Sequence, residues 1–256
     1  MFTFDYKSGY HHLDIFAGHT AFLGCSFQLE GKLRYFKFTV LPFGLATGPY
    51  VFTKIQRTLV KHWRSRGFRI FTYLDDGAGG EQGFAEACSI SESVRKDVRS
   101  SGFVANEEKS VWMPSQYEAL LGFIVDLTAG TFHVPPRRVD ALNQLLDVII
   151  AKDFRVSART LSRLTGSLVS MSLAMDPVVR LWTRAMYRDI CLALCWDQLI
   201  CLSSDSRSEV LFGNRTLTTA GIQSGHLALK SRSYHIQMLA VSVGEALLFI
   251  LMVNQL

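Results

Sequence analysis

Phenylalanine alternates with polar residues over positions 2–5, a pattern that predicts a short strand ending at Asp5. Two further β-rich runs, 21–29 and 33–40, are separated by a Glu-Gly-Lys sequence. Because Gly favours a tight turn, these runs are predicted to pair as a hairpin. The chain therefore opens with strands, and the first of them presents a carboxylate at its end.

A helix is predicted next, over 50–66, because apolar residues recur there at helical spacing. Its apolar face is expected to bury Ile55, Leu59 and Trp63, while lysines and arginines give it a basic second face. A second helix is predicted over 84–101, where the following Gly stops it.

Between these helices, an apolar strand over 68–74 runs directly into Asp75-Asp76-Gly77. Asp-Gly is among the strongest signals for a tight hairpin turn. The acidic pair is therefore expected at a hairpin tip.

The second half of the chain is richer in helical patterns. A hairpin is predicted over 118–134, with its turn near 128–130. Helical periodicity then recurs in three segments, 138–150, 158–174 and 177–194. Ser157 and Asp176 are well placed to cap the second and third of these helices.

Short strands are expected again over 199–222, so a third, small α/β piece is predicted to begin near 194. The final apolar segment, 236–253, is interrupted by Gln237, Ser242 and Glu245. A buried helix explains this segment better than a membrane span does.

Composition adds limits on the class of protein. Apolar residues make up 48% and charged residues 19% of 256 residues, which excludes a disordered or low-complexity chain. The net charge of +5 suits a partner with a phosphate backbone. Five cysteines without CxxC spacing indicate neither a zinc site nor a disulfide framework, and the N-terminus has no signal-peptide pattern. An intracellular protein, cytoplasmic or nuclear and not secreted, is expected, and the oligomeric state is left open.

Asp75 and Asp76 carry the candidate chemistry. An isolated Asp-Asp-Gly is more often a solvated turn than an active site. Here, however, it follows a largely apolar strand, and adjacent carboxylates near a third acid repel one another unless a cation neutralises them. Asp5 is the natural third carboxylate if the two strands are neighbours in one sheet. Such a group would need a metal ion.

Retroelement reverse transcriptases carry successive signatures that four segments of this chain resemble in order and spacing: FDYKSGYHHLDI, RYFKFTVLPFGLATGPYVFTK, YLDDG and NEEKS. Among these elements, the later segment SARTLSRLTGSLVSMSLAMDPVVRLWTRAMYRDI is most similar to the DIRS type. The resemblance implies an α+β fold in four parts. These are a right-hand polymerase palm with an antiparallel sheet (1–117), a primer-grip hairpin (118–134), a helical thumb (135–193) and a partial ribonuclease H-like α/β end (194–256).

The implied activity is RNA-directed DNA polymerisation with two Mg²⁺ or Mn²⁺ ions held by Asp5, Asp75 and Asp76. One ion would activate the attacking 3′-hydroxyl and the other would stabilise the leaving pyrophosphate, and hard oxygen ligands suit both. Asp76 is expected to be secondary, because successive side chains in a strand point to opposite faces. Lys109 matches the proton donor that the family offers to pyrophosphate, although most surface lysines are only solvated.

The resemblance also assigns a deoxynucleotide pocket. Tyr10 matches an aromatic gate that crowds a ribose 2′-hydroxyl, and the alternative is a packed tyrosine. Phe43 would stack beside the sugar, Gly44 and Gly48 would allow close backbone approach, and Tyr73 would line the same site.

Template and primer, RNA or DNA, are the implied macromolecular partners. Leu121 and Gly122, followed by Phe123, match the primer grip. Arginines recur every four residues on the predicted thumb helices, so either a basic stripe beside a duplex or a solvated helix face is possible. They are Arg159, Arg163, Arg180, Arg184 and Arg188.

Two departures from the family's pattern bear on activity. Only four residues precede Asp5, where the family has a basic fingers segment that clamps the triphosphate, so the chain is expected to be truncated and crippled on its own. At the ribonuclease H-like end, Asp205 would be the first acid, but Ala240 stands where a catalytic Glu is expected and Glu245 lies five positions further on. Hydrolysis by this end is not expected.

Two other functions stay open. A decayed retroelement fragment could fold and bind nucleic acid without catalysis. A two-metal nuclease would use the same acids, but LPFGLATGP and Tyr10 are features of nucleotide selection and count against it.

Overall fold

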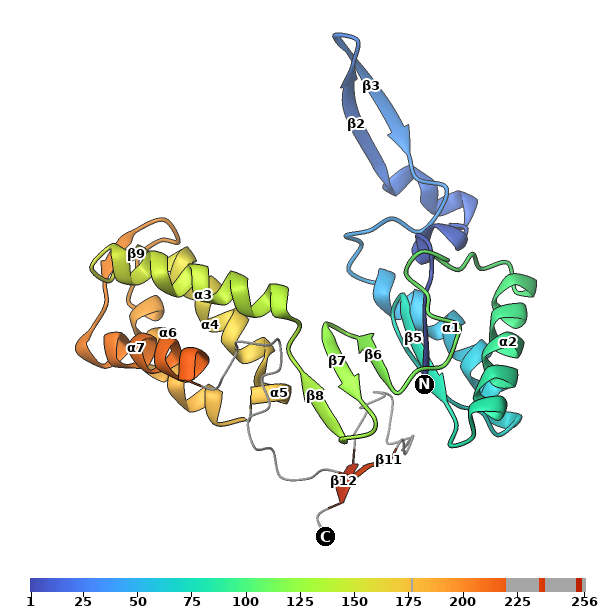
Figure 1. Cartoon of the computed structure of the whole chain (residues 1–256). Helices are drawn as coiled ribbons and strands as arrows, with labels where there is room; N and C mark the ends of the chain where they lie inside the picture. Colours follow the sequence, from blue (N-terminus) through green and yellow to red (C-terminus); the bar gives the residue numbers. More distant parts are fainter. Residues whose placement is uncertain (176, 220–234, 238–251, 255–256) are drawn as a thin grey trace. The chain divides into compact units, whose positions relative to one another are not determined.

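The computed structural model describes residues 1–175, 177–219, 235–237 and 252–254. The described residues fall into two compact units, Met1–Leu120 and the part from Leu121 onward. Figure 1 draws the elements of both, and each unit is described by itself.

A three-stranded antiparallel sheet forms the centre of the first unit. Its strands, in spatial order, are β1 (Phe2–Asp5), β5 (Asp76–Gly80) and β4 (Arg69–Tyr73). Phe4 lies opposite Gly77, and Asp5 lies opposite Asp76. On the other side of β5, Tyr73 is also paired with Asp76. The two strands that carry the acids are therefore neighbours in one sheet.

The turn between β4 and β5 lies earlier than predicted. Leu74 and Asp75 form it, whereas Asp76 and Gly77 already belong to β5. The reason is packing: a Cβ on Gly77 would overlap the Phe4 ring, so this Gly is needed inside the strand. The turn therefore contains no glycine, and Leu74 takes the left-handed backbone conformation there, with a φ of 51°.

Two helices pack with this sheet, α1 (Gly48–Ser65) and α2 (Phe84–Ser100), close to the predicted ranges. The buried face of α1 differs from the prediction, because Ile55 is 42% exposed and Gln56 is buried. An aromatic core fills the first unit. Its fully buried large side chains include Phe2, Phe4, Tyr6, Phe52 and Trp63.

The predicted N-terminal hairpin is present as β2 (Gly24–Leu29) and β3 (Lys32–Lys37). Its turn is Glu30–Gly31, with φ of 51° and 74°. Figure 1 shows it extending away from the β1–β5–β4 sheet of the same unit. The strand predicted from residue 21 begins only at Gly24, because Ala21 and Phe22 belong to η2 (Ala17–Phe22), a 3-10 turn. Another 3-10 turn, η1 (Gly9–His12), lies earlier in the chain.

The predicted hairpin over 118–134 has its first arm divided in two. β6 (Tyr117–Leu120) ends the first unit, and β7 (Phe123–Asp126) pairs with β8 (Thr131–His133) in the second. The β7–β8 turn lies where it was predicted, because Asp126 Oδ1 accepts hydrogen bonds from the backbone N–H groups of Thr128 and Ala129.

Helices make up most of the second unit, as predicted. They are α3 (Pro136–Ala151), α4 (Ala158–Ser170), α5 (Ser172–Met175), η3 (Pro177–Thr183), α6 (Arg184–Cys191) and α7 (Ser204–Thr219), with a short antiparallel pair of β9 (Arg155–Ser157) and β10 (Leu199–Cys201). Buried aliphatic residues of α3 and α4, such as Leu142, Ile149 and Leu161, share one core with Met186. The Ser157 hydroxyl caps α4 by accepting from Thr160 N at 3.2 Å. Asp176, the other predicted cap, lies outside the described residues.

The prediction of one helix over 177–194 is wrong, since η3 and α6 divide it. Strands were also expected over 199–222, and only β10 is found there before α7 begins. Ser203 Oγ accepts from Ser206 N at 3.3 Å, and Leu202 and Val210 are buried, so capping and core burial favour a helix here.

The last described strands, β11 (His235–Gln237) and β12 (Met252–Asn254), pair with each other. A strand at 235–237 contradicts the start of the buried helix predicted over 236–253. Ala240 and Glu245 lie outside the described residues. Among the helices that the structure describes, none has the length and apolar character needed to cross a membrane.

Candidate active site

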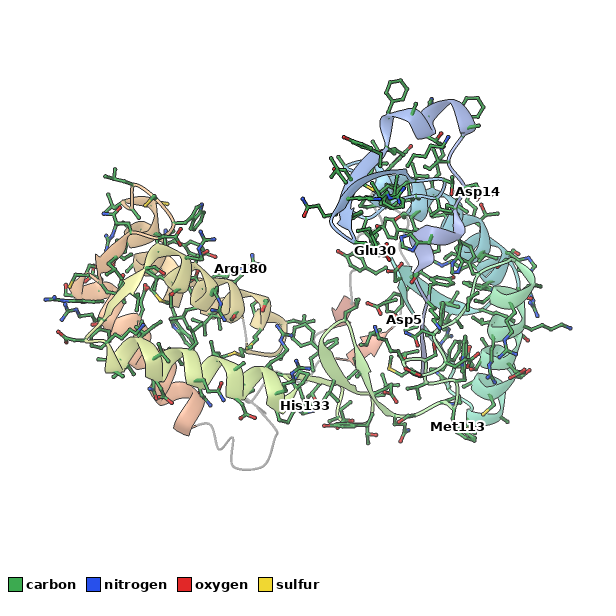
Figure 2. All side chains as sticks on the ribbon, turned by 90° about the horizontal axis from the view of Figure 1, so that it is seen from above. Asp5, Asp14, Glu30, Met113, His133 and Arg180 are labelled. Carbon is green, nitrogen blue, oxygen red and sulfur yellow. The ribbon has the colours of Figure 1, made fainter. Side chains whose placement is uncertain are left out.

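Three carboxylates stand at one end of the β1–β5–β4 sheet. Asp5 ends β1 (labelled in Figure 2), Asp76 begins β5 directly opposite it, and Asp75 occupies the turn between them and β4. Tyr6 N donates to Asp75 O at 2.9 Å, which ties the turn to the residue after Asp5. The register thus pairs Asp5 with Asp76, the acid that was expected from the sequence to be the secondary metal ligand.

The acids influence one another electrostatically. Burial raises the pKa of Asp75, and the negative charges of Asp5 and Asp76 raise it further, while Lys109 opposes them. The pKa of Asp76 is raised by burial and then by Asp5, again against Lys109. The structure therefore brings Asp5, Asp75, Asp76 and Lys109 into one electrostatic neighbourhood.

The Asp75 side chain has an incomplete environment. Its Oδ1 is buried and has no hydrogen-bond partner. A Cβ on Gly9 would lie 2.8 Å from this oxygen, so Gly9 leaves the space that the carboxylate needs. A buried carboxylate oxygen without a donor is costly, and a cation would compensate it.

Within the described ranges, no three His, Cys, Asp or Glu side chains lie close enough together to form a preformed metal-binding group. Carboxylates without a compensating cation repel one another. The oxygen-only donor set and the unsatisfied Asp75 Oδ1 fit a hard divalent cation, which would have to draw the carboxylates together.

Lys109 reaches the acids because its segment runs beside β1. Asn106 N donates to Asp5 O at 2.8 Å, and Val111 N donates to Thr3 O at 2.8 Å. Ser110 Oγ accepts from Asp5 N at 3.1 Å. Lys109 itself is exposed. The NEEKS segment therefore places the positively charged Lys109 near the acids and also holds the backbone of Asp5.

Tyr10 lies beside this acidic end of the sheet. It is 6% exposed, and its ring stacks on Phe52 at 4.8 Å between centroids and contacts Phe43 at 5.0 Å. Its pKa is raised by burial and then by Asp75 and Tyr73, so these groups are close. The packed tyrosine and the sugar gate are both compatible with this position.

The other predicted nucleotide-site residues surround Tyr10. Phe43 and Tyr73 are each 58% exposed, which leaves their rings free to contact a ligand. Gly44 has a left-handed φ of 86°. Gly48, the first residue of α1, allows the Tyr10 ring to approach, since a Cβ there would lie 3.2 Å from it.

Leu121 and Gly122 both have left-handed backbones, with φ of 49° and 78°. Arg138 Nη1 donates to Gly122 O at 2.6 Å, and the guanidinium lies 5.4 Å from the centre of the Phe123 ring. Helix α3 therefore anchors the predicted primer grip through Arg138, which the sequence pattern did not single out.

The arginine stripe is only partly as predicted. Arg159 and Arg163 share helix α4, as the spacing predicts. In the second run Arg180 lies in η3, so there the four-residue spacing is α-helical only between Arg184 and Arg188 of α6. Arg188 pairs with Asp205 at 2.9 Å. Arg159 makes two hydrogen bonds to Asp197, at 2.8 and 3.1 Å, which keep the pKa of that carboxyl below its usual range. Arg163, Arg180 and Arg184 are exposed.

Sequence reasoning missed Gln56 and Ser110. Gln56 is buried on α1, and its Nε2 donates to Leu74 O at 2.7 Å, in the turn that carries Asp75. Helical spacing could have found it, since it shares a face with Phe52 and Val60. Ser110 lay within the quoted NEEKS segment, where only the lysine was assigned.

Residues 1–125, which include all these acids, match the family described as reverse transcriptase (RNA-dependent DNA polymerase). This part of the chain, just under half of its length, is therefore similar to reverse transcriptase domains. A comparison with curated proteins gave no match.

Solved structures similar to this chain include three of the foamy viral protease-reverse transcriptase. The complex with RNA/DNA hybrid has a TM-score of 0.64 at 18% identity over 85% of this chain. A second, the dRH form with double-stranded DNA, has a TM-score of 0.63 at 19% identity over 91%. A third, also with double-stranded DNA, gives 0.62 at 20% over 85%. The mixed helix and sheet fold is thus that of reverse transcriptase structures. The chain spans 27%, 37% and 41% of the length of these three proteins.

Proposed function

We propose that this chain is the polymerase part of a DIRS-type retrotransposon's RNA-directed DNA polymerase, acting inside the cell in the cytoplasm or nucleus. It would extend a primer on an RNA or DNA template with deoxynucleoside triphosphates. The observation that carries the proposal is the register of the sheet. It sets Asp5 opposite Asp76, with Asp75 in the adjoining turn, inside the segment that matches the family.

Asp5, Asp75 and Asp76 would hold two Mg²⁺ or Mn²⁺ ions, which activate a 3′-hydroxyl and stabilise the leaving pyrophosphate when bound. The protein's own part is to supply anionic oxygens at fixed places. Burial and mutual repulsion already make the ionised acids unfavourable, so a cation gains more here than at an isolated surface Asp. Lys109, whose charge acts on Asp75 and Asp76, would be the proton donor to pyrophosphate.

The palm (1–117), primer grip (118–134) and thumb (135–193) are proposed as the functional parts of the chain. Nucleic acid is the proposed partner, because the similar solved structures are complexes with RNA/DNA hybrid or double-stranded DNA. Of the predicted stripe, the exposed Arg163, Arg180 and Arg184 are the best candidates for phosphate contacts. Leu121 and Gly122, anchored by Arg138, would contact the primer. No hydrolytic role is proposed for the end of the chain, because Asp205 is engaged by Arg188.

Primer extension tests the proposal. The chain is incubated with a DNA primer annealed to an RNA template, Mg²⁺ or Mn²⁺ and deoxynucleotides. In a preparation that shows extension, the rate should fall by at least about 10²-fold in Asp76→Asn, which removes a charged ligand. A duplex bound without extension would favour the second candidate, a fragment that binds nucleic acid without catalysis. Extension that is unchanged in Asp76→Asn would overturn the assignment of the acids.

Sugar selection gives a second test, applied to a preparation that shows extension. Tyr10→Ala should raise incorporation of ribonucleotides relative to deoxynucleotides by at least roughly tenfold, about 1.4 kcal/mol of differential binding, because a bulky ring no longer excludes the 2′-hydroxyl. Tyr10→Phe keeps the ring and should change little. If both variants keep the parent's preference, Tyr10 is only a core residue stacked on Phe52.

A further inference from the structure

The turn that carries Asp75 has an unfavourable backbone. Leu74 takes a left-handed φ of 51°, a conformation that L side chains other than those of Asn and Asp rarely adopt. It lies outside the β4–β5 ladder, which ends at the pair of Tyr73 and Asp76. The Leu74 carbonyl therefore has to find its hydrogen-bond donor elsewhere.

Gln56 provides that donor from the middle of α1. Its side chain is 1% exposed, and Nε2 donates to Leu74 O at 2.7 Å. Phe52 and Val60, one turn away on either side, are also buried, so the amide is held between packed side chains. A helix thus reaches the residue immediately before Asp75 through a rigid, buried contact.

The following residue is tied down separately. Tyr6 N donates to Asp75 O at 2.9 Å, directly after Asp5 in the chain. The two successive carbonyls of the turn, on Leu74 and Asp75, are thereby fixed by different elements, α1 and the end of β1. Between them they determine the direction in which the Asp75 side chain leaves the turn.

We propose that Gln56 is a positioning residue for the Asp75 carboxylate, and that its hydrogen bond to Leu74 sets how tightly the acidic end of the sheet binds a divalent cation. The inference rests on the proposed function in taking Asp75 as a cation ligand. Groups that orient a ligand in this way typically alter metal affinity by about 10- to 100-fold when they are removed.

The matched control is Arg64, on the same helix. Its Nε and Nη2 donate to Ile70 O at 3.1 and 3.0 Å, so it also joins α1 to β4, but away from the turn. Gln56→Met and Arg64→Met each remove donors to one carbonyl and keep an apolar stem. Mn²⁺ affinity of the whole chain is measured by calorimetry, and backbone hydrogen exchange of the Tyr6 amide by NMR.

We expect Gln56→Met to weaken Mn²⁺ binding at least about tenfold and Arg64→Met less than about twofold. Tyr6 amide exchange should speed up at least about tenfold in Gln56→Met alone. Equal effects of the two substitutions on Mn²⁺ affinity would overturn the proposal. Failure of both Gln56→Met and Gln56→Ala to fold, beside a folded Arg64→Met, would also overturn it, because Gln56 would then serve general stability.

A parent that does not bind Mn²⁺ would refute the proposed cation site rather than the role of Gln56 in the turn. Tyr6 amide exchange then decides: faster exchange in Gln56→Met alone supports that role, and unchanged exchange overturns it.

Discussion

Two hairpins of the first unit have tight two-residue turns but opposite surroundings. The β4–β5 hairpin shares a sheet with β1, and its Gly77 is buried under the Phe4 ring. The β2–β3 hairpin, with Glu30 at its turn (labelled in Figure 2), forms a two-stranded sheet of its own. It exposes large apolar side chains, among them Tyr35 at 79% and Phe36 at 46%.

The difference shows how the candidate site gets its geometry. A two-stranded hairpin in water is marginal, and its register depends on the turn. In β4–β5 the register is also fixed by rings packed on glycines, so Asp76 must lie opposite Asp5. The β4–β5 hairpin, whose register is fixed by packing, carries the acids. The exposed β2–β3 hairpin carries Lys32, Arg34 and Lys37 together with its aromatic side chains.

The largest expected effect compares the same substitution at Phe4, the β1 residue that packs on the β4–β5 hairpin, and at Phe36 of the β2–β3 hairpin. Phe4→Ala, at 2% exposed, should lower the free energy of unfolding by about 3–5 kcal/mol. Phe36→Ala should cost less than about 1 kcal/mol, because its ring is half exposed. Urea denaturation followed by tryptophan fluorescence measures both, since Trp63 and Trp112 contact Phe4. Similar costs for the two would remove the contrast between the hairpins.

A smaller difference is expected between their glycines. Gly77→Ala introduces a Cβ that overlaps the Phe4 ring and should cost about 3 kcal/mol. Gly31→Ala meets open space and bears only the strain of φ 74°, about 1 kcal/mol. The same denaturation series decides, and a Gly31 variant as damaging as the Gly77 variant would mean that turn strain, not ring packing, sets the cost.

Asp75 should behave unlike Asp97, another half-buried carboxylate of the same unit. Because the folded-state pKa of Asp75 is raised, its charge destabilises the metal-free fold at neutral pH, and this cost fades as pH falls through that pKa. Asp75→Asn should therefore raise the metal-free melting temperature at pH 7, with less gain at lower pH. Asp97→Asn is the control and should lower the melting temperature, since Asp97 accepts from Trp63 and Arg66. A destabilising Asp75→Asn would contradict the unfavourable environment described for this carboxylate.

Local patterns predicted much of this fold. Periodicity gave α1 and α2 nearly to their ends, and turn residues gave the β2–β3 hairpin. The β4–β5 turn was misplaced because the packing of Phe4 on Gly77 joins distant parts of the chain. For the same reason Gln56 was missed: a polar residue on a buried face has meaning only once its partner, Leu74 O, is known.

Paramagnetic broadening by Mn²⁺ tests the central claim most directly, namely that the register of β1, β4 and β5 builds a divalent-cation site. Backbone amide signals of the chain are followed by NMR as Mn²⁺ is added in small amounts. The account predicts that the amides of Asp5, Tyr6, Asp75 and Asp76 broaden first, and that Asp76→Asn abolishes this selectivity. Broadening that begins elsewhere, for example at the exposed Glu107, or that is unchanged in Asp76→Asn, would contradict it.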